Sequence, residues 1–127
     1  MGEGKDPSLL FVYGTLKRGF PNPWSRRLWS RAAFLGEASM PGRLLDLGAC
    51  PAMIEPASPH DLVHGEVAAL RDPSLLGSLD LYEGPQYKRI LRRVCMRDGA
   101  ERDAWVYLFR ASPGRARIIP GGRWPIQ

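Results

Sequence analysis

Short apolar runs, each bounded by glycine, proline or polar residues, dominate the pattern of hydrophobic positions along the chain. Runs of this kind are typical of β-strands. Strands are therefore predicted at residues 8–13, 34–40, 43–47, 52–54, 62–70, 87–96 and 104–109. The last of these, AWVYLF, is apolar on both faces, which predicts a central position in its sheet. Gly65 lies inside a predicted strand and indicates a bulge or a close backbone approach.

One segment near the N-terminus has helical spacing instead. Asn22 is predicted to cap this helix and Pro23 to occupy its first position, which are common placements for these residue types. Trp24, Leu28 and Ala32 then fall on one face, so this face is expected to pack against the strands.

A second helix is predicted in the segment DPSLLGSLDLYEG. Asp72 is its expected N-cap and Pro73 its expected first residue, and Gly84 stands where a glycine commonly ends a helix. Further along the chain, Asp98 and Gly99 predict the turn of a β-hairpin between the last two strands.

Many short strands and two short helices predict an α+β fold, in which a few short helices flank a curled mixed sheet or a small β-barrel. Residues 1–127 are expected to form a single domain. The tail from about residue 112 is rich in proline and glycine and is predicted to be irregular, with Ile118, Ile119 and Trp124 available to dock it.

The chain carries a net charge of +5, with a sequence pI near 9.7. Fifteen of its eighteen basic residues are arginines, and they are spread along the whole chain. Nucleic-acid-binding proteins usually gather such charge in one stripe or arm beside stacking aromatic residues. The densest basic run, Lys88 to Arg97, instead alternates with apolar positions and is predicted to be the solvent face of a strand. Nucleic acid is therefore not an expected partner, whereas a basic surface can attract small anions.

No apolar run in the sequence approaches the ~20 residues that a membrane-spanning helix needs. The residues MGEGKDPS lack the order of a signal peptide, and Asp6 stands where N-myristoylation needs serine or threonine. Cys50 and Cys95 are distant lone thiols, which suit a reducing compartment and are expected to be buried or idle. We therefore expect a soluble cytoplasmic protein with no membrane partner.

The two histidines do not predict a metal site. His60 and His64 have the spacing of ligands on one helix face, but they fall in a predicted loop and strand, and no third ligand stands nearby. We therefore expect neither a metal nor a cofactor.

The stretch FVYGTLKRG joins an apolar strand directly to a glycine turn. Gly14 and Gly19 have the spacing that opens a phosphate-binding loop, but the Phe-Pro that follows replaces the lysine and hydroxyl residue that such a loop needs. A nucleotide-binding loop is therefore excluded. Gly14 permits a sharp turn, and successive main-chain N–H groups from Gly14 to Leu16 can form a concavity that binds a carboxylate or a carbonyl oxygen.

Extended to FVYGTLKRGFPN, this stretch resembles the opening of the gamma-glutamylcyclotransferase-like proteins, in particular their AIG2-like and gamma-glutamylamine cyclotransferase branch. The resemblance continues over nearly the whole chain, in family order, with FLGEA, HGEV, LDLYEGPQYKR, WVY and GGRW. The YGTL block combined with a downstream Tyr-Glu-Gly is a specific pair. The resemblance implies the fold of this family and a small-molecule gamma-glutamyl substrate.

The resemblance also implies roles for individual residues. Tyr13, Gly14, Thr15 and Leu16 match the loop that receives the gamma-glutamyl group, and Glu83 matches the single catalytic glutamate. Glutathione-directed relatives commonly have serine in place of Thr15, so the chain is more similar to the amine-directed branch. Many relatives have histidine after the Pro-Asn of the opening block, where this chain has Pro-Trp, a departure that bears on the leaving group more than on the chemistry.

The reaction that the resemblance implies is intramolecular. The α-amine of a gamma-glutamyl group attacks its own γ-carbonyl, closes to 5-oxoproline and expels the attached amine. An enzyme accelerates such a step by holding the bent conformer. It must also supply a base for the ammonium proton, an acid for the leaving amine and donors for the developing oxyanion.

Glu83 suits the base. It lies four residues after Leu79 and seven after Leu76, on the apolar side of its predicted helix. Burial and a position at the helix C-terminus both raise the pKa of a carboxyl group. Tyr87 and Tyr107 are expected either to line the substrate cavity or to pack in the core with the hydroxyl at the surface.

Three other acidic residues are rivals for the role of base. Asp80 falls on a different face of the predicted helix and is expected to be solvated or paired with arginine. Glu66 could line a cavity, but a structural salt bridge is the expected arrangement, and Glu37 is the third rival.

The sequence thus predicts a cofactor-independent gamma-glutamyl cyclotransferase-like enzyme that acts on a gamma-glutamyl amine or a similar small molecule. One alternative is a gamma-glutamyl-removing cyclotransferase in a biosynthetic pathway. A second is a non-catalytic small-molecule-binding module of the same fold, which the presence of Glu83 disfavours. A third, a basic nucleic-acid-binding protein, is disfavoured by the dispersed arginines.

Overall fold

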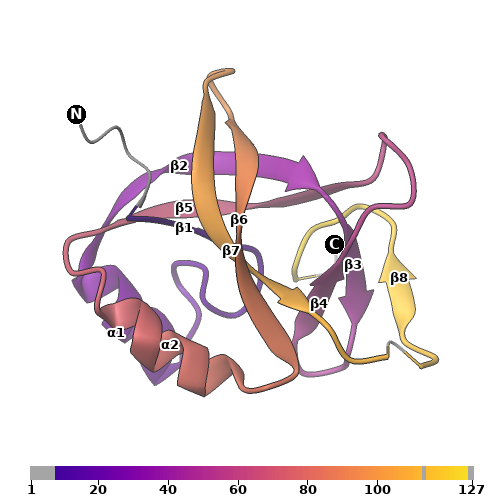
Figure 1. The fold of residues 1–127 in the computed structure, drawn as a ribbon, viewed down its shortest axis with the longest axis horizontal. Coiled ribbons are helices and arrows are strands. Elements are labelled where there is room, and N and C mark those ends of the chain that lie inside the picture. Colours follow the sequence, from indigo (N-terminus) through magenta and orange to yellow (C-terminus); the bar gives the residue numbers. More distant parts are fainter. Residues whose placement is uncertain (1–7, 113, 126–127) are drawn as a thin grey trace.

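The structure of the protein, a computed structural model, describes residues 8–112 and 114–125. Five strands form a closed barrel in the order β1-β5-β2-β6-β7, and three strands form a small sheet in the order β4-β3-β8. The elements are β1 (Leu9–Val12), α1 (Pro23–Ser30), β2 (Ala32–Pro41), β3 (Arg43–Asp46), β4 (Pro51–Ile54), β5 (Leu62–Leu70), α2 (Leu75–Glu83), β6 (Tyr87–Met96), β7 (Glu101–Phe109) and β8 (Arg117–Ile119). Both helices lie on one side of the barrel and the small sheet at the other (Figure 1). The predicted α+β class and barrel are confirmed.

The barrel closes between β1 and β7, which pair in parallel at Leu10 and Trp105. β7 also pairs antiparallel with β6, so it has a neighbour on both edges, as predicted from its apolar sequence. The turn between β6 and β7 is the predicted one. The Asp98 carboxylate accepts the Ala100 N–H at 2.9 Å, and Gly99 adopts a φ of 93° that favours glycine.

β1 approaches β5 closely at Gly65. A Cβ atom at this position would overlap the Val12 carbonyl oxygen and lie 2.9 Å from the Phe11 ring. The predicted close backbone approach is therefore confirmed. The irregularity in strand register lies instead in β2, between Phe34 and Gly36.

Two hydrophobic clusters stabilise the fold, and β1 contributes to both. Phe11 and Tyr13 belong to the cluster that fills the barrel, whereas Leu10 and Val12 belong to the cluster beneath the helices. Since successive side chains of a strand point to opposite faces, β1 is covered on both faces and reads as a continuous apolar run. The segment that leads into the glycine turn is thereby held in the centre of the molecule.

α1 begins as predicted but ends earlier. The Asn22 side chain accepts the Ser25 N–H at 2.8 Å, and Pro23 occupies the first turn. The helix ends at Ser30, so Ala32 is the first residue of β2 and not part of the helix. Ala32 is buried all the same, because β2 starts directly beneath the helix.

The predicted N-cap of α2 is wrong, and its predicted end is right. The N-cap is Ser74, which makes no side-chain cap hydrogen bond. Asp72 instead forms a tight turn in which its side chain accepts the Ser74 N–H and its carbonyl oxygen accepts the Leu75 N–H. Gly84 is the C-cap, with a φ of 87°.

The C-terminal segment is more regular than predicted. Residues 117–119 form β8, which pairs with β3, so the prediction of an irregular tail is wrong for this part. Ile119 is buried and Trp124 packs against the barrel cluster, whereas Ile118 is exposed. Two of the three predicted docking residues therefore contact the core.

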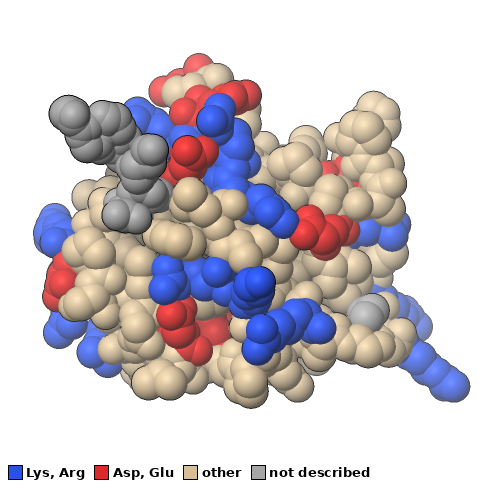
Figure 2. Space-filling view, viewed as in Figure 1, with Lys and Arg blue, Asp and Glu red and all other residues tan. Residues whose placement is uncertain are grey.

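Basic and acidic side chains are interspersed on the face shown in Figure 2. Along β6, Arg89 pairs with Asp80, Arg92 with Glu55, and Arg93 with two acidic residues of β7. Much of the positive charge in this dense basic run is therefore balanced locally. No helix within the described ranges is long and apolar enough to cross a membrane.

Candidate active site

One cavity of about 230 Å³ brings together every site residue predicted from the sequence. We call it the Glu83 cavity. The predicted residues that line it are Tyr13, Gly14, Thr15, Leu16, Glu83, Tyr87 and Tyr107. They come from the loop after β1, the end of α2, and strands β6 and β7, which are far apart in the sequence.

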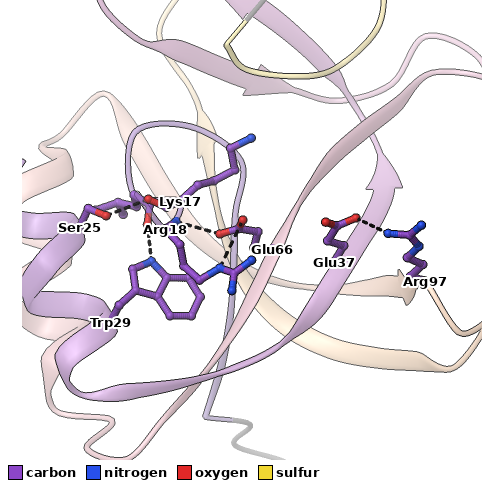
Figure 3. Close-up of polar contacts among 8 residues, drawn as sticks. Lys17, Arg18, Ser25, Trp29, Glu37, Glu66 and Arg97 are labelled. Atoms are coloured by element: carbon purple, nitrogen blue, oxygen red, sulfur yellow. Dashed lines mark hydrogen bonds and ion pairs between the residues drawn. The ribbon is translucent and has the colours of Figure 1, made fainter. Parts of the chain in front are cut away.

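The loop after β1 is held in place by hydrogen bonds from α1 and its N-cap residue. Three side chains donate hydrogen bonds to consecutive main-chain oxygens of the loop, two of which are drawn in Figure 3. The pairs are Asn22 Nδ2 to the Thr15 oxygen (2.7 Å), Trp29 Nε1 to the Leu16 oxygen (2.8 Å) and Ser25 Oγ to the Lys17 oxygen (2.8 Å). The carbonyl groups of the loop therefore point toward α1.

The same loop leaves main-chain donors available on the cavity side. The Lys17 N–H donates to the Gly14 oxygen at 3.1 Å and closes a tight turn with Thr15 and Leu16 at its centre. Within the described part of the chain, no group accepts a hydrogen bond from the N–H of Thr15 or Leu16. Adjacent free N–H groups of this kind bind carboxylate or carbonyl oxygens.

Gly14 is required for packing, not for an unusual backbone conformation. Its φ is not positive, whereas Gly19, at the other end of the loop, has a φ of 88°. A Cβ atom on Gly14 would lie 2.8 Å from the Pro51 ring, which forms the opposite side of the cavity. The close approach expected at Gly14 is therefore found, and its partner is Pro51.

Glu83 is the only carboxylate among the lining residues of this cavity. It lies on the same side of α2 as Leu79, which is fully buried, whereas Leu81 is 85% exposed. Burial raises the pKa of Glu83 to about 7. Within the described residues, no hydrogen-bond donor or cation is paired with its carboxylate. A carboxyl group in this state can exchange a proton near neutral pH.

The Tyr13 hydroxyl is fully engaged by the main chain. It donates to the Tyr107 oxygen at 2.7 Å and accepts the Met53 N–H at 3.3 Å. Tyr13 therefore presents its ring to the Glu83 cavity and ties the glycine loop to β7 and β4. Its hydroxyl is not available as a donor to a ligand.

Tyr107 and Tyr87 line the cavity with their hydroxyl groups partly engaged. The Tyr107 hydroxyl donates to Asp80 at 2.7 Å, and Asp80 also forms a two-point ion pair with Arg89. Although burial alone would raise the pKa of Asp80, the hydrogen bonds from Arg89 and Tyr107 lower it. Asp80 is thus a paired carboxylate, as predicted, and not a rival base. Burial raises the pKa of both tyrosines, so both stay protonated at neutral pH.

The structure adds lining residues that the sequence did not indicate. Cys50 lines the Glu83 cavity, and burial, together with the nearby Glu83, raises its pKa, which disfavours the nucleophilic thiolate. Tyr82 lines the mouth, and its ring stacks on Trp24 with a centroid separation of 5.0 Å. The only sequence signal for this pair was the Pro-Trp departure from the family pattern.

The remaining rival acids lie outside this cavity. Glu66 accepts the Arg18 N–H at 2.9 Å and pairs with the Arg18 guanidinium, so the expected structural salt bridge is confirmed. Glu37 pairs with Arg97. Within residues 8–112 and 114–125, no group of three potential ligands is placed to hold a metal ion.

Comparisons with known proteins identify the family and the fold of the chain. A family model described as "Gamma-glutamyl cyclotransferase, AIG2-like" matches residues 10–125. The chain is 33% identical to a Vibrio cholerae protein named "Putative gamma-glutamylcyclotransferase", over 91% of the chain and 94% of that protein. It is also similar to the crystal structure of YkqA from Bacillus subtilis (TM-score 0.74, 26% identity), matching 93% of this chain and 39% of that one. An AIG2-like protein from Mus musculus gives a TM-score of 0.68 at 27% identity, over 84% of this chain and 80% of that one.

Proposed function

The chain belongs to the gamma-glutamyl cyclotransferase, AIG2-like family, and on this premise we propose that it releases 5-oxoproline and a free amine from a gamma-glutamyl amine. The observation that carries the proposal is Glu83, a half-buried carboxylate with no partner among the described residues, whose pKa of about 7 suits proton exchange. It shares a cavity with the N–H groups of Thr15 and Leu16, which donate to no other group in the described ranges.

The charge pattern of the cavity fits a bent gamma-glutamyl group. None of its lining residues is lysine or arginine, so Glu83 is the one charged side chain that an α-ammonium group would meet there. The turn at Thr15 and Leu16 offers N–H donors to the α-carboxylate or the γ-carbonyl oxygen. A cavity of about 230 Å³ is small, which favours the compact conformer in which amine and carbonyl are close.

The proposed proton path uses Glu83 twice. Its carboxylate takes a proton from the α-ammonium, and the freed amine attacks the γ-carbonyl carbon to form the C–N bond of the ring. The oxyanion that forms receives hydrogen bonds from main-chain N–H groups of the glycine loop. Protonated Glu83 then gives its proton to the departing amine as the original C–N bond breaks, so the carboxylate is regenerated. The ring nitrogen loses its second proton as the lactam forms, and this proton is balanced by release of the amine in its ammonium form.

Turnover of a panel of gamma-glutamyl amines, followed by detection of 5-oxoproline, tests this proposal. Release of 5-oxoproline and free amine in equal amounts is the expected result. Turnover of only a larger gamma-glutamyl-protected molecule would favour a step in a biosynthetic pathway. Saturable binding with no 5-oxoproline from any substrate would contradict the proposal and favour a binding module.

A further inference from the structure

A second and larger hollow lies on the surface, with a volume of about 690 Å³. We call it the Lys17 groove. It is formed by β2, β5, the end of β6, Lys17 and residues 123–125, and it shares no lining residue with the Glu83 cavity. Its volume falls in the range of sites that bind small molecules. The proposed cyclase chemistry makes no use of it.

Each of the two carboxylates of the groove is paired with an arginine. Glu37 and Glu66 are directly opposite each other on β2 and β5, an arrangement in which like charges repel. Each has an arginine partner on its outer side: Arg97 lies 3.1 Å from Glu37, and Arg18 lies 3.6 Å from Glu66 (Figure 3). These ion pairs offset part of the negative charge of the two carboxylates, although both still act on Lys17.

Two cations of the groove have no such partner. In the described part of the chain, neither Lys17 nor Arg123 forms an ion pair or a side-chain hydrogen bond. Figure 3 shows the Lys17 amino group extending away from the Glu66–Arg18 pair. Burial lowers the pKa of Lys17; the nearby Glu66 and Glu37 carboxylates oppose this shift, and Arg123 adds to it. A half-buried ammonium beside a second cation gains free energy when an anion binds between them.

The segment that carries Arg123 is anchored on both sides. The Gly122 oxygen accepts the His64 N–H from β5 at 2.8 Å, and a Cβ on Gly122 would overlap the Leu62 oxygen. On the other side of Arg123, Trp124 packs against the barrel cluster. Arg123 therefore projects from a fixed backbone beside His64, whose pKa is lowered by burial and by Arg123.

We propose that the Lys17 groove binds a small molecule through an oxyanion group, a phosphate or a carboxylate, held between Lys17 and Arg123. The site is separate from the cyclase site and does not depend on the function proposed above. Lys17 still links the two sites, since its side chain lines the groove and its N–H closes the turn that carries Thr15 and Leu16. An anion bound in the groove would therefore contact Lys17, the residue whose N–H closes the substrate-binding turn.

The two histidines of the chain provide a direct readout. His64 lines the groove, whereas His60 is exposed and lies outside it. We would follow the imidazole NMR signals of both while titrating inorganic phosphate, and separately malonate, at constant ionic strength set with sodium chloride. A saturable shift of the His64 signal without a matching shift of His60 is the expected result. A response to only one of the two anions would identify the oxyanion class.

Three variants make the test specific. Lys17→Met and Arg123→Gln each remove one proposed contact and should raise the apparent Kd by about tenfold or more, as expected for the loss of one charge-assisted hydrogen bond. Arg123→Lys keeps the charge and should retain most of the response. Arg102→Gln removes an exposed arginine outside the groove and should leave the titration unchanged. Circular dichroism checks that each variant is folded.

The proposal is overturned if neither anion shifts His64 beyond the effect of chloride. It is also overturned if folded Lys17→Met and Arg123→Gln respond as the wild type does, because the anion would then bind elsewhere.

Discussion

The hydroxyl of Tyr13 donates a 2.7 Å hydrogen bond to the main-chain oxygen of Tyr107, 94 residues further along the chain. This bond joins the start of the glycine loop to β7, whose Tyr107 side chain also lines the Glu83 cavity. The loop is thus tied on one side by Tyr13 and on the other by the donors of α1. Such fixed positioning is what an intramolecular reaction requires of its catalyst.

Tyr13→Phe should lower stability and weaken substrate binding together. The variant keeps the ring but leaves the Tyr107 oxygen and the Met53 N–H without their buried partner. The expected loss of unfolding free energy is about 1–3 kcal/mol. Urea unfolding and steady-state kinetics measure both effects, and an unchanged stability would show that the bond contributes nothing. Tyr82→Phe, at a residue that is 42% exposed, is the matched control for stability alone, because Tyr82 also lines the Glu83 cavity.

Gly14→Val should raise KM and reduce stability. The added side chain would collide with the Pro51 ring, so either the loop or β4 must move away from the cavity. Gly121→Val provides a control, since a Cβ there meets no atom within 4 Å. A Gly14→Val protein with wild-type stability and wild-type KM would show that this contact does not shape the site.

Much of this site was predictable because its signals are local. Glu83 was placed on the apolar side of a helix end by its spacing from Leu76 and Leu79 and by the terminal Gly84. The YGTL block identified the glycine loop that lines the cavity. Other features depend on contacts distant in sequence. The approach of Pro51 to Gly14 and the position of Cys50 in the cavity follow from the docking of the small sheet onto the barrel.

β8 was missed for a related reason. Three residues in a proline- and glycine-rich segment carry too little pattern to predict a strand, and it is the pairing with β3 that makes them one. The first turn of α2 differs from the prediction because the Asp72 side chain accepts the Ser74 N–H in a tight turn. The regular helix therefore begins at Leu75. The closure of β1 on β7 rests on one parallel pair and has no sequence signature.

Metal chelation should leave activity unchanged. The proposed proton transfers use only Glu83 and the substrate, and no group of three potential ligands is assembled within the described ranges. Activity measured before and after EDTA treatment and dialysis tests this expectation. Loss of turnover that zinc or magnesium restores would contradict it.

Glu83→Gln should stabilise the folded protein at alkaline pH. The pKa of Glu83 is about 7 in the folded state against an ordinary value of 4.5, so the folded state binds more protons between these values. Wild-type stability should therefore fall as the pH rises through this window. Above it, the ionised carboxylate costs up to about 3 kcal/mol, which glutamine avoids. Urea unfolding near pH 4 and near pH 8 measures the difference in unfolding free energy between Glu83→Gln and the wild type. This difference should be close to zero at the lower pH.

The kinetics of Glu83→Gln test the central claim most directly. Glutamine preserves the size of the side chain but cannot accept the ammonium proton, so kcat should fall by roughly 10²–10⁴-fold while KM changes less. The wild-type kcat should decline on the acid side near pH 7, because Glu83 must be ionised to act as the base. Glu66→Gln, which can still accept the Arg18 N–H, should keep most activity. A Glu83→Gln protein that forms 5-oxoproline at the wild-type rate would contradict the proposed mechanism.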